Sequence, residues 1–216
     1  MTAPVTGLML DVQRRLEGLY ALEPTSPVSE FLIPEAEASH YPGDGSRTLV
    51  AQDGDSVSLG VILEDGVRET LARRDPRARL DLKNLGPFCT LAEEVSHFLY
   101  LLFCARAARS ITELELELQG EVDKYLCSVF LLTLQNEGAV SCRLRQLLFR
   151  NYRLLEGLTP EQAERYRAAN ELAWRYSGYL EARYLRGARF QDLVREARRF
   201  YRLGQREKLE KIALLQ

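Results

Sequence analysis

The chain has 216 residues, of which 46% are apolar and 28% charged, with a formal net charge of −2. This composition is typical of a folded globular protein and excludes a disordered chain, which is too poor in apolar residues to form a core. A net charge near zero gives no general attraction to nucleic acid or to a membrane, so we expect neither as a partner.

The charge is unevenly distributed along the chain. From Arg143 onward, 17 Lys and Arg stand against 9 Asp and Glu; subtraction from the totals of 29 and 31 leaves 12 and 22 in the first 142 residues. The two halves could attract each other within one fold, or the basic half could face an anionic partner. The length predicts one domain, 1–216, with a mixed part at 1–87 and a helical part at 88–216.

The cysteines indicate a reducing compartment. Their spacing fits neither a zinc knuckle nor a redox CxxC motif, and each lies in an apolar helical context. The first twenty residues contain Asp11 and two arginines after a short apolar run, unlike a signal peptide. No apolar run reaches the length of about 18 residues that a membrane span needs. We therefore expect a cytoplasmic protein whose reduced core thiols are Cys89, Cys104, Cys127 and Cys142.

The first third of the chain predicts a helix followed by strands. Residues 6–21 form an amphipathic pattern with Leu8, Val12, Leu16 and Leu19 on one side. Prolines break the chain afterwards, with a short strand predicted at 28–33 and a loop at 41–46. Residues 47–51 and 56–63 flank Asp53-Gly54, which predicts a β-hairpin.

The remainder of the chain predicts helices. A turn at 64–66 leads to a short helix that ends before Pro76, and the chain beyond Pro87 is helical. The Ser/Thr-x-x-Glu/Gln pattern of a capping box predicts three helix starts. These are Thr90-Leu-Ala-Glu93, Ser110-Ile-Thr-Glu113 and Thr159-Pro-Glu-Gln162. The fold class is α+β, a small N-terminal antiparallel sheet packed on a predominantly helical body.

One helical stretch, Leu91–Cys104, carries the candidate chemistry. It is apolar nearly all round, as in a buried helix, but Glu93, Glu94 and His97 share one arc near its start. Buried carboxylates and imidazoles are costly unless they are paired, hydrogen-bonded or metal-bound. Two interpretations stay open: Glu93 caps the helix and His97 is a core histidine, or the three side chains form a metal site.

The stretch Glu93-Glu94-Val-Ser-His97 resembles the HExxH helix of zincin metallopeptidases, with Glu93 at the first His position. The resemblance implies a zincin-like fold, metal binding by Glu93 and His97, and Glu94 as the general base acting on a peptide substrate. The gluzincin branch takes its third ligand from a later helix, which implies Glu117 or Glu121. An alignment through Asp123 instead places that ligand at Gln119.

The metal implied by the resemblance is zinc. The carboxylate-rich set formed by Glu93, His97 and Glu117 or Glu121 shifts the preference toward manganese or iron. A catalytically lost relative of the family needs no metal.

Two other resemblances compete for the same residues. The sequence around Glu93, Glu94 and His97 is similar to the Glu-Glu-x-x-Glu helix of MazG-type nucleotide pyrophosphohydrolases, which implies Mg²⁺ and a nucleotide substrate. Glu94-x-x-His97 also has the spacing of half a ferritin-like di-iron site. The second half is missing, because the only other histidine is His40 in a predicted loop.

The later helices carry an acidic stripe and a basic, aromatic-rich surface. Glu113, Glu117 and Glu121 recur every four residues, as a solvated face or as a carboxylate row facing His97. Arginines alternate with aromatics from 165 to 202, which predicts core aromatics with arginine stems directed outward. A non-enzymatic helical module that binds an unidentified protein therefore stays an alternative to the hydrolase.

Overall fold

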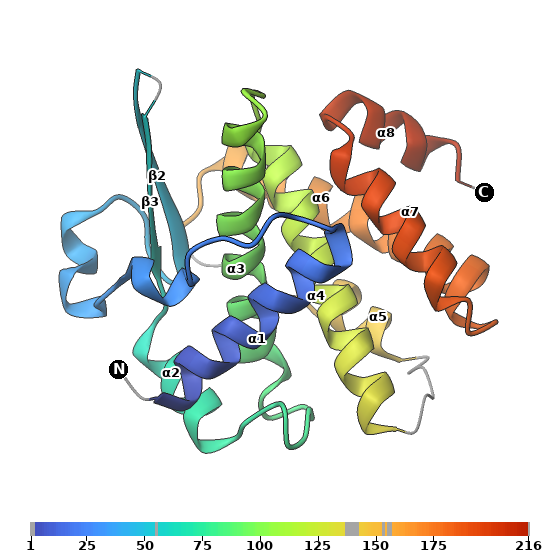
Figure 1. Ribbon diagram of the computed structural model, residues 1–216, viewed down its shortest axis with the longest axis horizontal. Coiled ribbons are helices and arrows are strands. Elements are labelled where there is room, and N and C mark those ends of the chain that lie inside the picture. The colour runs from blue at the N-terminus through green and yellow to red at the C-terminus, as the bar shows by residue number, and fades with distance from the viewer. Residues whose placement is uncertain (1–2, 55, 137–142, 153, 155–156, 216) are drawn as a thin grey trace. The chain divides into compact units, whose positions relative to one another are not determined.

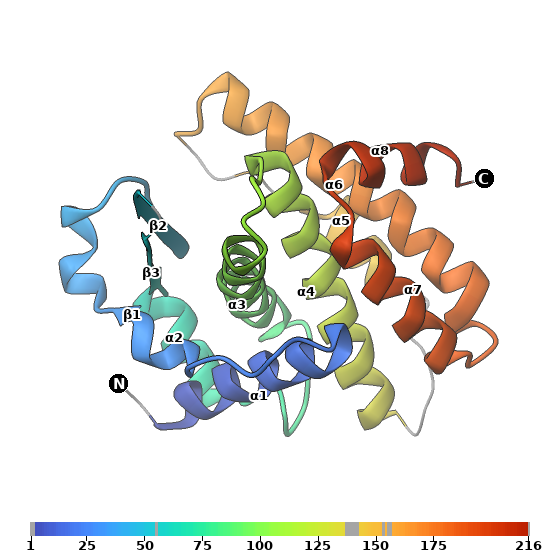
Figure 2. The same cartoon turned by 45° about the horizontal axis from the view of Figure 1, so that its top comes forward.

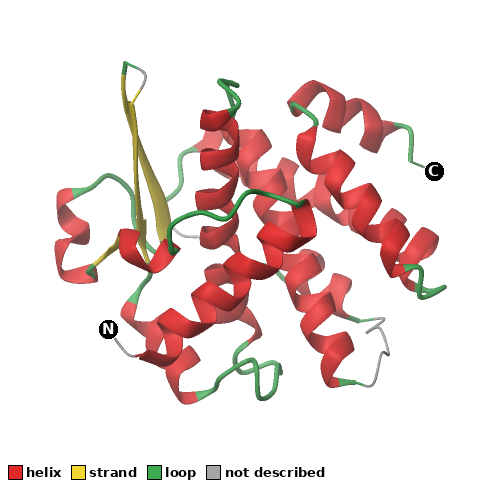
Figure 3. Cartoon of the chain, in the orientation of Figure 1, coloured by secondary structure: helices red, strands yellow, loops and turns green. Residues whose placement is uncertain are grey.

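The computed structural model describes residues 3–54, 56–136, 143–152, 154 and 157–215. It is mostly helical with one small sheet (Figure 3), which confirms the predicted α+β class. The chain forms two compact units. The first comprises Met1–Gly18 and Leu22–Arg109, and the second comprises Leu19–Ala21 and Ser110–Gln216.

The first unit holds the sheet and the helices of the N-terminal half of the chain (Figure 1). The last two residues of α1 belong to the second unit. The elements are α1 (Ala3–Tyr20), η1 (Val28–Phe31), β1 (Leu32–Ile33), η2 (Glu35–His40), β2 (Arg47–Asp53), β3 (Ser56–Ile62), α2 (Asp65–Arg73) and α3 (Leu85–Arg106).

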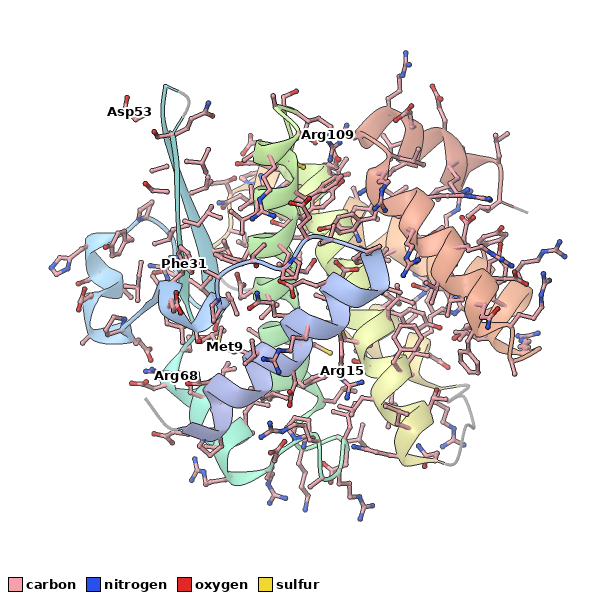
Figure 4. The ribbon with its side chains drawn as sticks, in the orientation of Figure 1. Met9, Arg15, Phe31, Asp53, Arg68 and Arg109 are labelled. Atoms are coloured by element: carbon pink, nitrogen blue, oxygen red, sulfur yellow. The ribbon has the colours of Figure 1, made fainter. Side chains whose placement is uncertain are left out.

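The predicted hairpin is present and forms most of the sheet. Strands β2 and β3 pair antiparallel with Asp53 opposite Ser56, and Gly54 adopts a φ of +57° at the turn. In Figure 4, Asp53 is labelled at the tip of the hairpin. Strand β1 adds a short parallel pair at the other edge of β3, giving the order β1-β3-β2.

The predicted strand at 28–33 is mostly wrong. Only Leu32–Ile33 is extended, and Val28–Phe31 is a 3₁₀ turn. The backbone N–H of Val28 donates to Gln13 Oε1 at 2.8 Å, and that of Glu30 donates to the Pro27 carbonyl at 2.9 Å. These bonds use donors that a strand would need for its ladder.

The hairpin packs on α3. Strands β2 and β3 both contact this helix, and the two ribbons lie beside it in Figures 1 and 2. The centroid of the Phe31 ring, at the end of η1, lies 4.8 Å from that of the Phe98 ring on α3. This aromatic contact joins the segment before β1 to the helix. The sheet therefore covers the helix that carries Glu93, Glu94 and His97.

The predicted apolar face of α1 is confirmed. Leu8, Val12, Leu16 and Leu19 are all buried, and Met9 joins them. On the same helix, Gln13 Nε2 donates to Glu17 Oε1 at 2.9 Å. That carboxylate also accepts the Thr25 backbone N–H at 3.0 Å, which fixes the chain after the helix.

Two of the three predicted helix starts are wrong. Helix α3 begins at Leu85, five residues before Thr90, and contains Pro87 in its first turn. The first N–H groups of a helix have no intrahelical partner, so proline is tolerated there. Glu93 therefore lies well inside the helix, and a role in capping is excluded.

The second helix start lies two residues later than predicted. Helix α4 (Glu113–Gln135) is capped by Thr112, whose side chain accepts the Glu115 N–H at 3.2 Å, rather than by Ser110. The box at Thr159 is confirmed, because Thr159 and Gln162 exchange side-chain and backbone hydrogen bonds.

The described residues of the second unit form helices joined by loops, with no strand among them. Helix α6 contacts α4, α5 and α8. Its core is rich in aromatic rings, with Tyr176 stacked on Phe200 at 3.9 Å and Arg145 lying 3.7 Å above the Trp174 ring. The Tyr176 and Phe200 rings are buried, as predicted for the aromatics of this region, and Arg145 stacks on the half-buried Trp174 ring. The elements after α4 are α5 (Leu144–Arg150), α6 (Pro160–Leu180), η3 (Glu181–Leu185), α7 (Phe190–Arg202) and α8 (Gln205–Ala213).

One helix among the described residues, α3, is long and apolar enough to cross a membrane. In its most apolar window 72% of the residues are buried inside the protein, which fits the core helix of a soluble protein. Cys89, Cys104 and Cys127 are buried free thiols, as predicted. The fourth predicted core thiol, Cys142, lies outside the described residues.

The corrected helix starts make a testable contrast between two threonines. Thr159→Ala should lower the free energy of unfolding by about 1 kcal/mol, because it removes a helix cap. Thr90→Ala should be close to neutral, because Thr90 sits inside α3 with its hydroxyl 3.4 Å from the Gly86 carbonyl and alanine favours helix. Urea denaturation of both variants measures the difference. An equal loss of unfolding free energy in Thr90→Ala would indicate that the helix is capped by Thr90, as the sequence predicted.

Candidate metal-binding residues

Three candidate side chains lie on α3 in the first unit. Glu94 and His97 are 6% and 7% exposed, and Glu93 is half-buried. His97 Nδ1 lies 3.8 Å from Glu94 Oε2, too far for a hydrogen bond but close enough for an ion pair when the ring is protonated. The carboxylate thus lies on the Nδ1 side of the ring, the arrangement that in metal proteins orients a histidine to bind through its other nitrogen.

The hairpin fixes Glu94. Thr48 on β2 donates from its hydroxyl to Glu94 Oε2 at 2.8 Å, and the same hydroxyl lies 3.2 Å from the Glu94 carbonyl oxygen. The sequence did not reveal this contact with Thr48, because Thr48 lies 46 residues away in a strand of ordinary composition. The sheet therefore restrains the side chain that the sequence predicts as a general base.

The acidic stripe of α4, in the second unit, divides into an exposed and a buried part. Glu113 is exposed and forms an ion pair with Arg165 of α6. Glu117 and Glu121 are each 8% exposed, so a fully solvated stripe is excluded. Lys124 Nζ donates to Glu121 Oε1 at 2.7 Å and neutralises that carboxylate locally. Glu117, which belongs to a group of possible metal ligands that does not contain Glu121, is the better candidate on this helix.

Gln119 and Asp123 take part in a different buried network of the second unit. Asp123 Oδ1 accepts hydrogen bonds from the Tyr20 hydroxyl and from Gln119 Nε2, the latter at 3.0 Å. Lys208 Nζ donates to Gln119 Oε1 at 2.8 Å, and none of the four side chains is more than 1% exposed. Burial, and then the charge of Asp123, raise the pKa of Tyr20, which stays a donor at neutral pH.

This network removes one of the predicted ligand positions. Both the oxygen and the nitrogen of the Gln119 amide are engaged by neighbours in the second unit. Two residues along a helix correspond to a rotation of about 200°, so Gln119 points away from the side that carries Glu117. An alignment that places the third ligand at Gln119 is therefore inconsistent with the structure.

Comparison of the chain with protein-family models, with curated proteins and with solved structures finds no match. The resemblances to zincins and to MazG-type enzymes thus rest on the helix motif alone. The function has to be argued from the chemistry of the side chains described above.

The network around Asp123 should contribute to stability. Asp123→Ala leaves the buried Tyr20 hydroxyl without the carboxylate it donates to and removes the 3.0 Å hydrogen bond of the Gln119 amide, so it should lower the free energy of unfolding by about 2–5 kcal/mol. Glu113→Ala removes an exposed ion pair and should cost at most about 1 kcal/mol. Thermal and chemical denaturation of the two variants test the contrast. Similar small losses in both would mean that the network is not a major source of stability.

Proposed function

We propose that this protein is a zincin-like, metal-dependent hydrolase in which Glu93, His97 and Glu117 bind a divalent metal ion. The observation that carries the proposal is that these three residues form a group of side chains suited to hold a metal ion. Glu93 and His97 are one helical turn apart on α3, so their side chains project from the same face of the helix. Glu117 adds a buried carboxylate from α4.

The donor set fits a transition metal. Two carboxylates and one imidazole supply three protein ligands, the number typical of catalytic sites that leave a position for water. Imidazole favours zinc or iron, and carboxylate oxygens favour manganese, so the set suits zinc, manganese or iron. Ligand binding would also offset the cost of burying His97 and Glu117 in the protein interior.

Each neighbouring side chain has a distinct task in the proposed reaction. A bound ion would lower the pKa of a coordinated water and so supply a nucleophile at neutral pH. Glu94 holds the transferred proton as general base, and Thr48 keeps its carboxylate in place through the 2.8 Å hydrogen bond. The zincin resemblance makes a peptide the expected substrate, and the buried free thiols favour the cytoplasm as the location.

The alternative functions receive less support. A MazG-like site needs a second pair of carboxylates on the following helix, and Asp123 is already bonded to Tyr20 and Gln119. The non-enzymatic alternative remains a helical module that binds another protein, and it requires no metal. A catalytically lost relative would not hydrolyse peptides, and it needs no metal.

The metal content of purified protein tests the ligand set. The untagged wild type should contain about one equivalent of zinc, manganese or iron by elemental analysis, since three ligands of one site act together. His97→Ala and Glu117→Gln should each lose most of that metal. Glu113→Gln is the matched control from the exposed part of the same stripe and should retain it.

Glu121→Gln separates the two buried glutamates of α4. It should retain the metal, because Lys124 already engages its carboxylate. Loss of metal in Glu121→Gln but not in Glu117→Gln would transfer the ligand role to Glu121. A wild type without metal after growth in metal-supplemented medium would exclude the metal site and leave a metal-free relative of the fold or the interaction module.

Glu94→Gln tests the general base. The variant keeps an oxygen that can accept the Thr48 hydroxyl, so it should fold and retain metal while peptide hydrolysis falls by about 10²–10⁴-fold. Hydrolysis of a mixed fluorogenic peptide library, with metal content measured in parallel, provides the readout. Undiminished hydrolysis in this variant would assign the base elsewhere.

A further inference from the structure

A second candidate site lies in the helical unit, far along the chain from the motif on α3. A cavity of about 380 Å³ opens between the π-helical turn η3 and helix α7. Six of its lining residues carry the argument: Arg183, Tyr184, Arg189, Asp192, Arg195 and Arg199. Four guanidinium groups around one cavity are unusual, because like charges repel unless an anion separates them.

The acidic groups on the wall are already engaged. Asp192 accepts Arg189 Nε at 2.8 Å and also pairs with Arg195. Glu196, which lines the cavity as well, accepts Lys211 Nζ at 2.9 Å and the Tyr176 hydroxyl at 3.3 Å.

Two positive charges are left over at the cavity. Within the described part of the chain, neither Arg183 nor Arg199 forms an ion pair with an acidic side chain. Both side chains are exposed, so a ligand from solution can reach them.

The backbone beside the cavity is irregular. Residues Glu181–Leu185 form a π-helical turn, a rare conformation that recurs at functional sites. Three residues later Ala188 has a φ of +51°, in the left-handed region that costs a non-glycine residue about 1 kcal/mol. Tyr184 belongs to the π-helical turn, and its hydroxyl lies 3.1 Å from that of Tyr179.

We propose that this cavity binds a small phosphate-bearing molecule, with Arg183 and Arg199 contacting the phosphate. Guanidinium groups present paired donors that match phosphate oxygens, and the cavity volume lies in the range of about 300–1,000 Å³ typical of small-molecule sites. That volume exceeds the need of a free phosphate ion, so an organic phosphate ester or a diphosphate fits better. Burial raises the pKa of Tyr184 to about 12, so its hydroxyl stays protonated as a further donor.

Some of the basic side chains of the C-terminal half thus gather around this cavity. From Arg143 onward the sequence has 17 basic and 9 acidic side chains. The sequence alone does not show where in the fold the basic side chains gather. The cavity gathers four of these arginines around one space. None of its lining residues is a proposed metal ligand, so the two proposals can be tested separately.

Titration calorimetry with pyrophosphate and with a nucleoside monophosphate, both without added metal, tests the proposal. Wild-type protein should bind at least one of them saturably, and binding should weaken as salt rises. The double variant Arg183→Gln/Arg199→Gln should bind at least tenfold more weakly. Arg206→Gln is the control, because Arg206 is an exposed arginine on α8 that does not line the cavity.

The outcomes are distinguishable. Absence of saturable binding of both probes to a folded wild type, or equal binding by the double variant, would overturn the proposal. A single-stranded oligonucleotide provides a further arm. If only the oligonucleotide binds, and the double variant and Arg206→Gln weaken it equally, the basic surface acts as a diffuse nucleic-acid contact and the small-molecule site is wrong. Circular dichroism of each variant verifies that it is folded.

Discussion

An ionisable side chain that leaves water has to find a partner inside the protein, because an unpaired buried charge costs several kcal/mol. This constraint acts on both units. In the first, Glu94 lies against Thr48 and near His97. In the second, Asp123 accepts two hydrogen bonds and Lys208 donates to Gln119 although neither charged side chain is more than 1% exposed. The helices of each unit are apolar enough to be buried, so the polar groups they carry fix how each helix is oriented within its own unit.

The same constraint separates structural from candidate functional groups. A buried charge whose neighbours satisfy it, as Tyr20 and Gln119 satisfy Asp123, needs no ligand to explain it. Glu93, His97 and Glu117 combine two carboxylates with an imidazole, a set of donors that a divalent metal ion can use. Their assignment as ligands and the assignment of Glu94 as base are proposals that the variants above can separate.

The sequence correctly predicted those structural elements that depend on residues close together in the chain. The hairpin at Asp53-Gly54, the apolar face of α1 and the capping box at Thr159 follow from residues within a few positions of one another. The starts of α3 and α4 were misplaced because Ser/Thr-x-x-Glu patterns also occur by chance inside or before a helix, and Pro87 is compatible with a first turn.

Contacts between distant residues could not be predicted from the sequence. Tyr20 and Asp123 are 103 residues apart, and Gln119 and Lys208 are 89 residues apart, with no pattern linking them. The candidate site was found only because Glu93, Glu94 and His97 share one helix. Thr48 was missed because its role depends on how β2 packs on α3.

X-ray absorption spectroscopy of the metal in the untagged protein tests the central claim most directly. The chain contains only two histidines, and His40 lies on an exposed turn, so the signal of a coordinated imidazole can be assigned. We predict one imidazole and otherwise oxygen ligands at about 2.0–2.2 Å, with no sulfur at about 2.3 Å, and no imidazole signal from any metal that His97→Ala retains. A sulfur ligand, or an unchanged imidazole signal in that variant, would contradict the account.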